Sequence, residues 1–236
     1  MEWKGAFVEQ MKRFAVYYAP PPGPLADLGA HWLGRDPATG ATLPHPTLPG
    51  LPRPVADLTR TPRKYGLHGT FKPPFRLADG QTPQTLHVAC ADLASRLAPV
   101  EMAGLALTRL GGFLALTPLG DVAALAALSA AVVQGLEAWR APLTPAEIAR
   151  RRPERLTPRQ RALLDLWGYP YVMEEFRFHL TLTDDLPEAE AAVTARILAA
   201  HLTPALPAPF AVRSICLFGE TAEGLFHLLH RYPLSG

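Results

Sequence analysis

The chain has little that would mark it as secreted, membrane-bound or metal-dependent. It has only two cysteines, Cys90 and Cys216, which lie far apart in helix-like and strand-like runs. We therefore expect two buried thiols in a reducing compartment, without a disulfide framework or metal-ligand spacing. No apolar run approaches the length that spans a bilayer. These absences predict a cytoplasmic protein with no membrane partner.

Charge is also scarce and nearly balanced. Charged residues make up 19% of the 236 residues and the formal net charge is +2, so no strong field surrounds the whole protein. A hydrophobic fraction of 48% excludes a disordered chain. Residues 1–13 contain acidic side chains and no apolar segment, so we do not expect a secretory signal, and we interpret residues 1–12 as an extension before the fold.

What the sequence does contain is a short pattern that occurs twice, a histidine and a threonine two residues apart. The copies are His68-x-Thr70 and His179-x-Thr181, and each lies in a strand-like stretch. Residues i and i+2 of a strand point to the same face, so each copy presents one imidazole beside one hydroxyl. If the two strands are neighbours, two imidazoles and two hydroxyls meet in one site.

The segments that follow the two copies are alike. The first copy is followed by a helical pattern at 83–97 and a hairpin pattern at 105–117, and the second by a helical pattern at 187–202 and strands at 210–218 and 225–231. From histidine to hairpin turn is about 43 residues in both cases. A repeated strand–helix–hairpin unit predicts equivalent positions for the motifs in two related lobes.

The remaining segments complete an α+β fold class. Phe14–Tyr18 predicts a first strand, residues 36–54 a long loop, and Leu67–Phe71 a motif strand that ends at Pro73-Pro74. Helical spacing at 121–139 precedes a helical insertion at 143–171. We expect one bilobal domain over residues 1–236, with pseudo-symmetric lobes at about 13–118 and 172–236 around a central cleft and a helical segment, 121–171, between them.

Two imidazoles and two hydroxyls in one site suit attack on a phosphodiester. One histidine takes a proton from the nucleophile, the other gives a proton to the leaving oxygen, and the hydroxyls bind the non-bridging oxygens. No metal or cofactor is required. The residues do not decide which histidine is the base. The alternative is that both copies are ordinary strand residues, with threonine present for its β-propensity.

Longer strings around the motifs resemble the 2H phosphoesterase superfamily, in particular its bacterial branch named for phosphonate-utilisation operons. The strings are Arg13–Pro21, Trp32–Asp36, Tyr65–Phe75 and Phe176–Thr183. The resemblance covers about residue 13 to the C-terminus. It implies a bilobal 2H-phosphoesterase fold and metal-independent action on 2′,3′-cyclic phosphates or RNA 3′ ends.

The sequence therefore predicts an enzyme that opens a 2′,3′-cyclic phosphate at an RNA 3′ end or trims RNA from that end. We expect it to act as a monomer on an RNA 3′ end or a cyclic nucleotide. One alternative is a phosphodiesterase that acts on a small ribosyl cyclic phosphate in phosphonate metabolism. Another is a non-catalytic module that binds RNA or a nucleotide.

Four further residues are candidates for substrate binding. Lys72 and Arg177 lie two residues from Thr70 and His179, on the same predicted strand faces, where a cation would neutralise phosphate. Tyr65 precedes the first histidine by three residues and is a candidate for stacking on a base. Tyr17 and Tyr18 point to opposite faces of the first strand, and we choose Tyr18 for the cleft.

The helical insertion carries a local excess of arginine that would guide a phosphate backbone, although a solvated helical face is the alternative. The arginines are Arg150, Arg151, Arg152, Arg155, Arg159 and Arg161. Phe75 and Tyr169 are further candidate base platforms, with core packing as the alternative. His227 and His230 lie three apart on a strand-like run, so they face opposite sides and make a poor metal pair.

Overall fold

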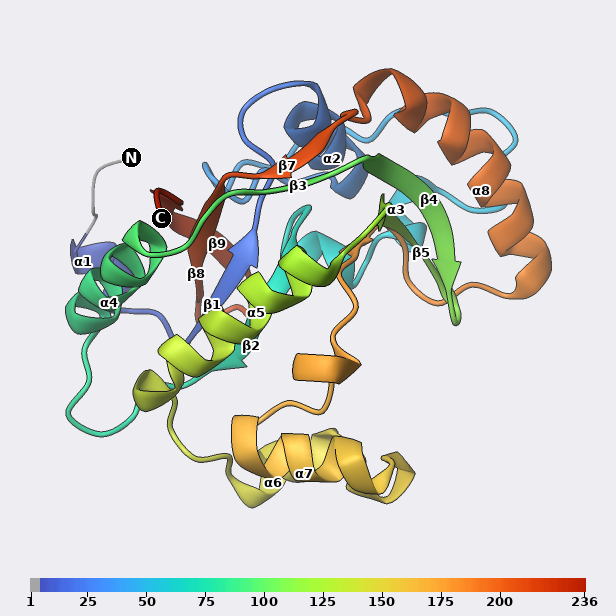
Figure 1. The fold of residues 1–236 in the computed structure, drawn as a ribbon. Coiled ribbons are helices and arrows are strands. Elements are labelled where there is room, and N and C mark those ends of the chain that lie inside the picture. The colour runs from blue at the N-terminus through green and yellow to red at the C-terminus, as the bar shows by residue number, and fades with distance from the viewer. Residues whose placement is uncertain (1–4) are drawn as a thin grey trace.

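A seven-stranded antiparallel sheet lies at the centre of the fold (Figure 1). The structure is a computed structural model, and it describes residues 5–236. The strand order is β4-β5-β6-β2-β1-β8-β9, and β3 and β7 form a separate two-stranded sheet. The strands are β1 (Arg13–Tyr18), β2 (Gly69–Phe75), β3 (Val100–Met102), β4 (Gly104–Leu110), β5 (Phe113–Leu119), β6 (Leu180–Thr181), β7 (Phe210–Val212), β8 (Ser214–Glu220) and β9 (Phe226–Pro233). The α+β class predicted from the sequence is confirmed.

The helices are α1 (Gly5–Val8), α2 (Pro24–Leu33), α3 (Val55–Leu58), α4 (Pro83–Ser95), α5 (Ala123–Gly135), α6 (Pro145–Arg150), α7 (Pro158–Trp167) and α8 (Glu188–Leu202), with 3-10 turns η1 (Pro62–Lys64), η2 (Glu137–Trp139), η3 (Pro153–Arg155), η4 (Met173–Glu175) and η5 (Thr203–Ala205). The helices predicted at 83–97, 121–139 and 187–202 are confirmed with similar bounds, and α1 lies in the segment 1–12 that we interpreted as an extension. Helices α4, α6 and α7 each start with a Thr-Pro pair in which the threonine hydroxyl accepts from the backbone N–H at position N3. Proline suits the first helical turn because its missing N–H would be unpaired there.

The two repeated units exchange their hairpins within the sheet. The β4–β5 hairpin follows the first motif but pairs with β6 of the second, and the β8–β9 hairpin follows the second motif but pairs with β1. The β3–β7 pair joins the units again. The two halves of the sheet therefore do not correspond to the predicted lobes at 13–118 and 172–236, because each half takes strands from both.

Strand β2 continues through the two prolines that were expected to end it. Its register against β1 pairs Val16 with Lys72 and Phe14 with Phe75, with shifts on either side of Val16. Pro73 and Pro74 lie in this irregular stretch, where a missing N–H breaks no regular ladder bond. The second motif strand is shorter than predicted, since only Leu180–Thr181 is regular strand.

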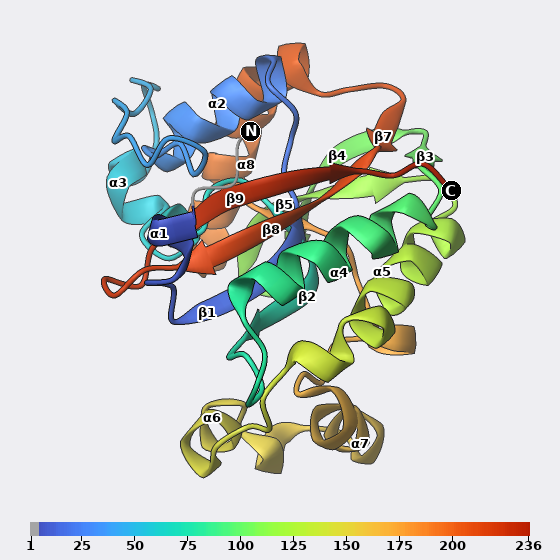
Figure 2. The same cartoon turned by 90° about the vertical axis from the view of Figure 1, so that its left-hand side faces the viewer.

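The main core lies on one face of the sheet. Helix α4 packs on β8 and β9, α5 packs on β2, and α8 packs on β4 and β5. Helices α6 and α7 lie together at one end, away from the sheet, in both Figure 1 and Figure 2. Within residues 5–236, each helix is too short or too polar to cross a bilayer.

Alternate residues of β1 face opposite sides of the sheet, so each side has its own group of packed residues. Val16 and Tyr18 belong to the main core, whereas Ala15 and Tyr17 belong to a smaller apolar cluster with residues of β8 and β9. Cys90 and Cys216 are buried and unbridged, as predicted. The loop at 36–54 contains neither helix nor strand, also as predicted.

Candidate active site

All four motif residues line one cavity of about 410 Å³ on the face of the sheet opposite the main core. Strands β2 and β6 are antiparallel neighbours with Gly69 opposite Leu180. The same register sets His68 opposite Thr181 and Thr70 opposite His179. Each imidazole therefore faces the hydroxyl of the other copy of the motif as well as its own.

The middle residues of the motifs turn away from this cavity, into the core. Leu180 is fully buried. At Gly69 a Cβ would lie 2.4 Å from the ring of Phe178, so only glycine allows that ring to pack here. Phe178 directly precedes His179. The packing of its ring on Gly69 therefore sets how closely the two motif strands approach each other.

The two histidines are held in the same way. Nδ1 of His68 is 2.9 Å from the carbonyl oxygen of Gly66, and Nδ1 of His179 is 2.8 Å from that of Arg177. In each case the carbonyl belongs to the residue two positions earlier. Because Nδ1–H donates to this oxygen, the Nε2 atom of each ring is left to take or give a proton.

The surroundings of His68 favour its neutral form. The Tyr17 ring lies against the imidazole with 4.2 Å between centroids, and the Tyr65 ring lies at 5.3 Å. Burial is the main cause that lowers the pKa of His68 to about 4; the bond to Gly66 opposes the shift, and the nearby His179 adds to it. His68 is therefore unprotonated at neutral pH.

The remaining walls bring in the helical insertion. Arg151 and Tyr169 line the cavity, and the guanidinium carbon of Arg151 lies 4.8 Å from the Tyr169 ring centroid. Phe113 lies beside His179, with 5.6 Å between ring centroids. The cavity thus places a guanidinium beside aromatic rings. The guanidinium can donate hydrogen bonds to a phosphate, and the rings can contact a small organic group attached to it.

The hydroxyl of Thr183, two residues after Thr181, also lines the cavity but has a structural partner. It accepts the backbone N–H of Leu114 at 2.9 Å. The Asp184 carboxylate accepts the backbone N–H of Thr61 at 2.8 Å at the rim. Among residues 5–236, no group of three or more histidine, cysteine, aspartate or glutamate side chains is arranged to hold a metal ion.

Three of the predicted binding residues lie elsewhere. Lys72 is buried, with its Nζ 2.7 Å from the Glu137 carboxylate, because the irregular register of β2 turns it from the cavity face into the core. Tyr18 faces the core side of β1, so the tyrosine of the histidine cavity is Tyr17. The Arg177 side chain is exposed and does not line the cavity. Tyr65 does line it.

Of the two candidate base platforms, only one lies at the cavity. Tyr169 lines the cavity, whereas Phe75 is buried in the main core. His227 and His230 have different surroundings, as predicted: His227 lies 2.9 Å from the Arg35 guanidinium, and His230 lies against Tyr232.

A protein-family model described as "protein of unknown function (DUF1045)" matches residues 70–227. The chain belongs to the DUF1045 family. The matched region contains Thr70, both residues of the second motif, Arg151 and Tyr169, and it begins two residues after His68.

Two curated relatives of this DUF1045 chain are named ribose 1,5-bisphosphate phosphokinase PhnN. The protein from Janthinobacterium sp. (strain Marseille) is 39% identical over 97% of this chain and 52% of its own length. The protein from Laribacter hongkongensis (strain HLHK9) is 36% identical over 90% of this chain and 49% of its own length. The chain spans about half the length of these relatives.

Solved structures similar to this DUF1045 chain include a phosphoesterase, with a TM-score of 0.47 and 14% identity over 95% of this chain and 99% of the other. Another is E. coli LigT complexed with 3′-AMP, with a TM-score of 0.43 and 15% identity over 95% of this chain and 98% of the other.

Sequence reasoning did not single out two residues that line the histidine cavity, Arg151 and Tyr17. Arg151 was one of six arginines in the insertion, and only the fold shows that it is the one that reaches the histidines. Tyr18 was chosen over Tyr17 for the cleft, and the choice was wrong, because Tyr17 is the residue that lines the cavity. The irregular register between β1 and β2 also hid the position of Lys72, because a bulge reverses the facing of later residues.

Proposed function

We propose that this DUF1045 chain is a metal-independent phosphodiesterase of the 2H type, with His68, Thr70, His179 and Thr181 as its catalytic residues. The observation that carries the proposal is that two imidazoles, each fixed through Nδ1, line one cavity with both motif hydroxyls. Two histidines supply the base and the acid, and two hydroxyls supply donors to the phosphate oxygens.

The lowered pKa of His68 supports its assignment as the base. Nε2 of His68 takes a proton from a water molecule while the water oxygen bonds to phosphorus. Nε2–H of His179 gives its proton to the leaving ribose oxygen as the P–O bond breaks. The products are a phosphate monoester and a free hydroxyl, and both histidines exchange protons with solvent before the next turnover.

We propose a small ribosyl cyclic phosphate as the substrate. A cavity of about 410 Å³ suits a ligand of that size. The name of the curated relatives, ribose 1,5-bisphosphate phosphokinase, supports a sugar phosphate. Opening a 1,2-cyclic phosphate on ribose 5-phosphate at the O2 side releases ribose 1,5-bisphosphate, the compound in that name.

The second candidate substrate is an RNA 3′ end carrying a 2′,3′-cyclic phosphate, or one trimmed from its 3′ terminus. The observation in its favour is the pair of half-buried tyrosine rings in the cavity wall, Tyr65 and Tyr169. A tyrosine ring with an open face binds a nucleobase by stacking. The same rings also suit the face of a sugar, so substrate comparison must separate the two candidates.

The deciding experiment uses the purified chain in excess EDTA and follows the phosphorus products by NMR. The substrates are the 1,2-cyclic phosphate of ribose 5-phosphate, 2′,3′-cyclic AMP, and oligoribonucleotides with cyclic phosphate or hydroxyl ends. We expect kcat/KM to be highest for the ribosyl compound. A rate that increases with RNA length would favour the RNA candidate instead.

Substitution of the histidines tests the chemistry itself. We expect His68→Gln and His179→Gln each to lower kcat by about 10²–10⁴-fold, the usual contribution of an acid or base. His201→Gln, in the last turn of α8, is the matched control and should keep the full rate. Nucleotide binding without turnover of any substrate between pH 5 and 9 would favour a non-catalytic binding module.

A further inference from the structure

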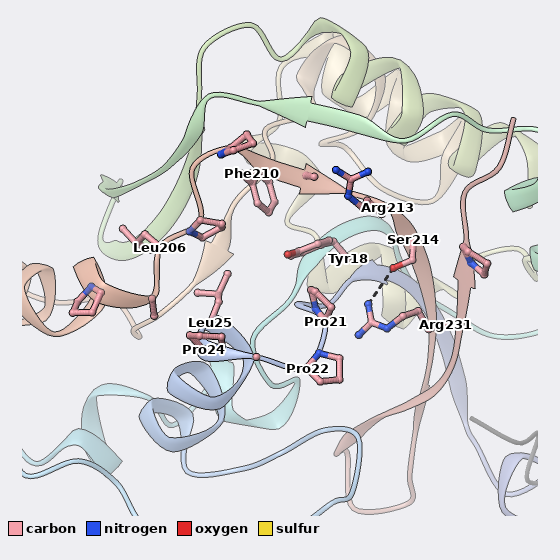
Figure 3. A pocket seen from close by; sticks show the side chains of 17 residues that line it. Tyr18, Pro21, Pro22, Pro24, Leu25, Leu206, Phe210, Arg213, Ser214 and Arg231 are labelled. Carbon is pink, nitrogen blue, oxygen red and sulfur yellow. Dashed lines mark hydrogen bonds between the residues drawn. The ribbon is translucent and has the colours of Figure 1, made fainter.

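A second cavity, of about 710 Å³, is shown in Figure 3. It is lined by Tyr18, which faces the core side of β1, whereas Tyr17 on the other face lines the histidine cavity. The walls of the second cavity come from the loop between β1 and α2, from residues 204–211, and from β8 and β9. None of its lining residues lines the histidine cavity. The neighbouring residues Tyr17 and Tyr18 divide between the two cavities, so the sites lie back to back across the sheet.

The walls of this second cavity are apolar and rigid. Seven of the 17 lining residues are prolines, which have no flexible side chain to order on binding. Leu25, Leu206 and Phe210 add larger apolar surface, and the three labelled side chains surround the open space in Figure 3. Such a cavity suits the flat or cyclic body of a small molecule.

Tyr18 brings a polar group into this apolar space. Its side chain is 3% exposed, and its hydroxyl points into the cavity without a hydrogen-bond partner in the described part of the chain. Edge contacts with Phe178 and Phe210 hold the ring. The hydroxyl oxygen is not among the fully enclosed unpaired atoms of residues 5–236, so it opens into the cavity, where a ligand can accept its hydrogen bond. Burial also raises the pKa of Tyr18, so the hydroxyl keeps its proton and acts as a donor.

Arg231 supplies a fixed positive charge beside the same cavity. Its guanidinium donates to the carbonyl oxygens of Ala19 and Pro20 and to the hydroxyl of Ser214. These three partners are neutral, and the ion pairs of residues 5–236 do not include Arg231. A cation held in place without a carboxylate is suited to an anion from outside the chain.

Arg213 adds a second, exposed cation at the edge of the cavity. Its side chain is 71% exposed, and its only carboxylate contact in the described residues is with Glu101 at 3.5 Å. Because the pair is exposed and long, the guanidinium is free to turn towards a ligand at little cost.

We propose that this second cavity binds a small organic anion, with an apolar ring system between the prolines and a carboxylate, sulfonate or phosphate group at Arg231 and Arg213. The Tyr18 hydroxyl donates a hydrogen bond to the same ligand. The proposal is independent of the reaction at the histidines, since the two cavities share no residue.

Fluorescence titration with 8-anilinonaphthalene-1-sulfonate tests the proposal, since the probe has an aromatic body and one sulfonate. N-phenyl-1-naphthylamine is its uncharged counterpart. We expect one saturable sulfonate site per chain, unaffected by His68→Gln. Loss of the site in the His68 variant would assign the probe to the histidine cavity and overturn the proposal.

Two variants and one matched control test where the probe binds. Tyr18→Phe should weaken sulfonate binding by about three- to tenfold, the net contribution of a typical hydrogen bond. Arg213→Gln should weaken the sulfonate probe by about threefold and leave the uncharged probe unchanged. Arg60→Gln removes a similarly exposed arginine elsewhere and should change neither.

Ala211→Trp fills the cavity and should abolish binding of both probes. If this variant fails to fold, Tyr18→Phe and Arg213→Gln still decide the question, because both substitutions preserve the local packing. Equal affinity of the sulfonate probe for the wild type, Tyr18→Phe and Arg213→Gln would overturn the proposal.

Discussion

The ring of Tyr17 covers one face of the His68 imidazole, with 4.2 Å between the two centroids and 40° between the ring planes. Tyr17 is itself 1% exposed and packs on Phe218 and Phe226. This arrangement shields that face of the His68 ring from water and explains why its protonated form is disfavoured. Several predictions of behaviour in solution depend on this pair or on its neighbours.

Tyr17→Leu should raise the pKa of His68 towards its usual value, because the smaller side chain admits water to the imidazole. If His68 is the base, the wild-type rate falls only as the pH drops through about 4. In the variant this fall should begin at a higher pH, so activity at pH 5 decreases more than activity at pH 7. Tyr17→Phe keeps the ring and should retain the wild-type profile, and an unshifted profile in Tyr17→Leu would contradict the assignment.

The same burial makes folding stability depend on pH. The unfolded imidazole titrates near 6.5, whereas His68 in the fold titrates at about 4, so the unfolded chain binds more protons between these values. The free energy of unfolding should therefore fall as the pH drops from about 6.5 to about 4. Urea denaturation of wild type and His68→Gln at pH 7 and pH 4.5 isolates this contribution. The wild type should lose about 2 kcal/mol more than the variant between the two pH values.

Lys72 should matter for stability and not for turnover. Its Nζ is bound to the Glu137 carboxylate and to the carbonyl oxygen of Val133. Lys72→Met leaves Glu137 paired with Arg140, so we expect a change of about 1 kcal/mol or less. Glu137→Gln leaves a buried ammonium without its charge partner and should cost about 3–5 kcal/mol. Urea denaturation gives both values, and kcat per folded molecule should be unchanged in Lys72→Met.

Arg151 should contribute to binding of the phosphate substrate. Its guanidinium lines the histidine cavity over the ring of Tyr169. Arg151→Gln should raise KM by about tenfold, the loss expected for one charge-assisted hydrogen bond, with a smaller effect on kcat. Arg150→Gln, at the neighbouring exposed position, is the control and should leave both constants unchanged. An equal rise in KM for the two variants would indicate long-range charge and not a contact.

Much of the secondary structure follows from local signals in the sequence. The Thr-Pro pairs at 82, 144 and 157 start helices because the threonine caps the first turn and proline fits within it. Gly34 ends α2 in a left-handed conformation, as glycine allows. The prolines of β2 were misread because their effect depends on the neighbouring strand, and a bulge opposite β1 accommodates them.

The two His-x-Thr motifs were readable because their geometry is local, since residues two apart on a strand share a face whatever surrounds them. The sequence by itself therefore determined the paired imidazoles and hydroxyls, the repeated unit and the α+β class. The tertiary structure alone decided that the hairpins exchange partners, that Tyr17 and Arg151 complete the histidine cavity, and that Lys72 and Tyr18 lie outside it. These outcomes depend on strand register and on contacts between residues far apart in the chain, and one bulge is enough to reverse the facing of a side chain.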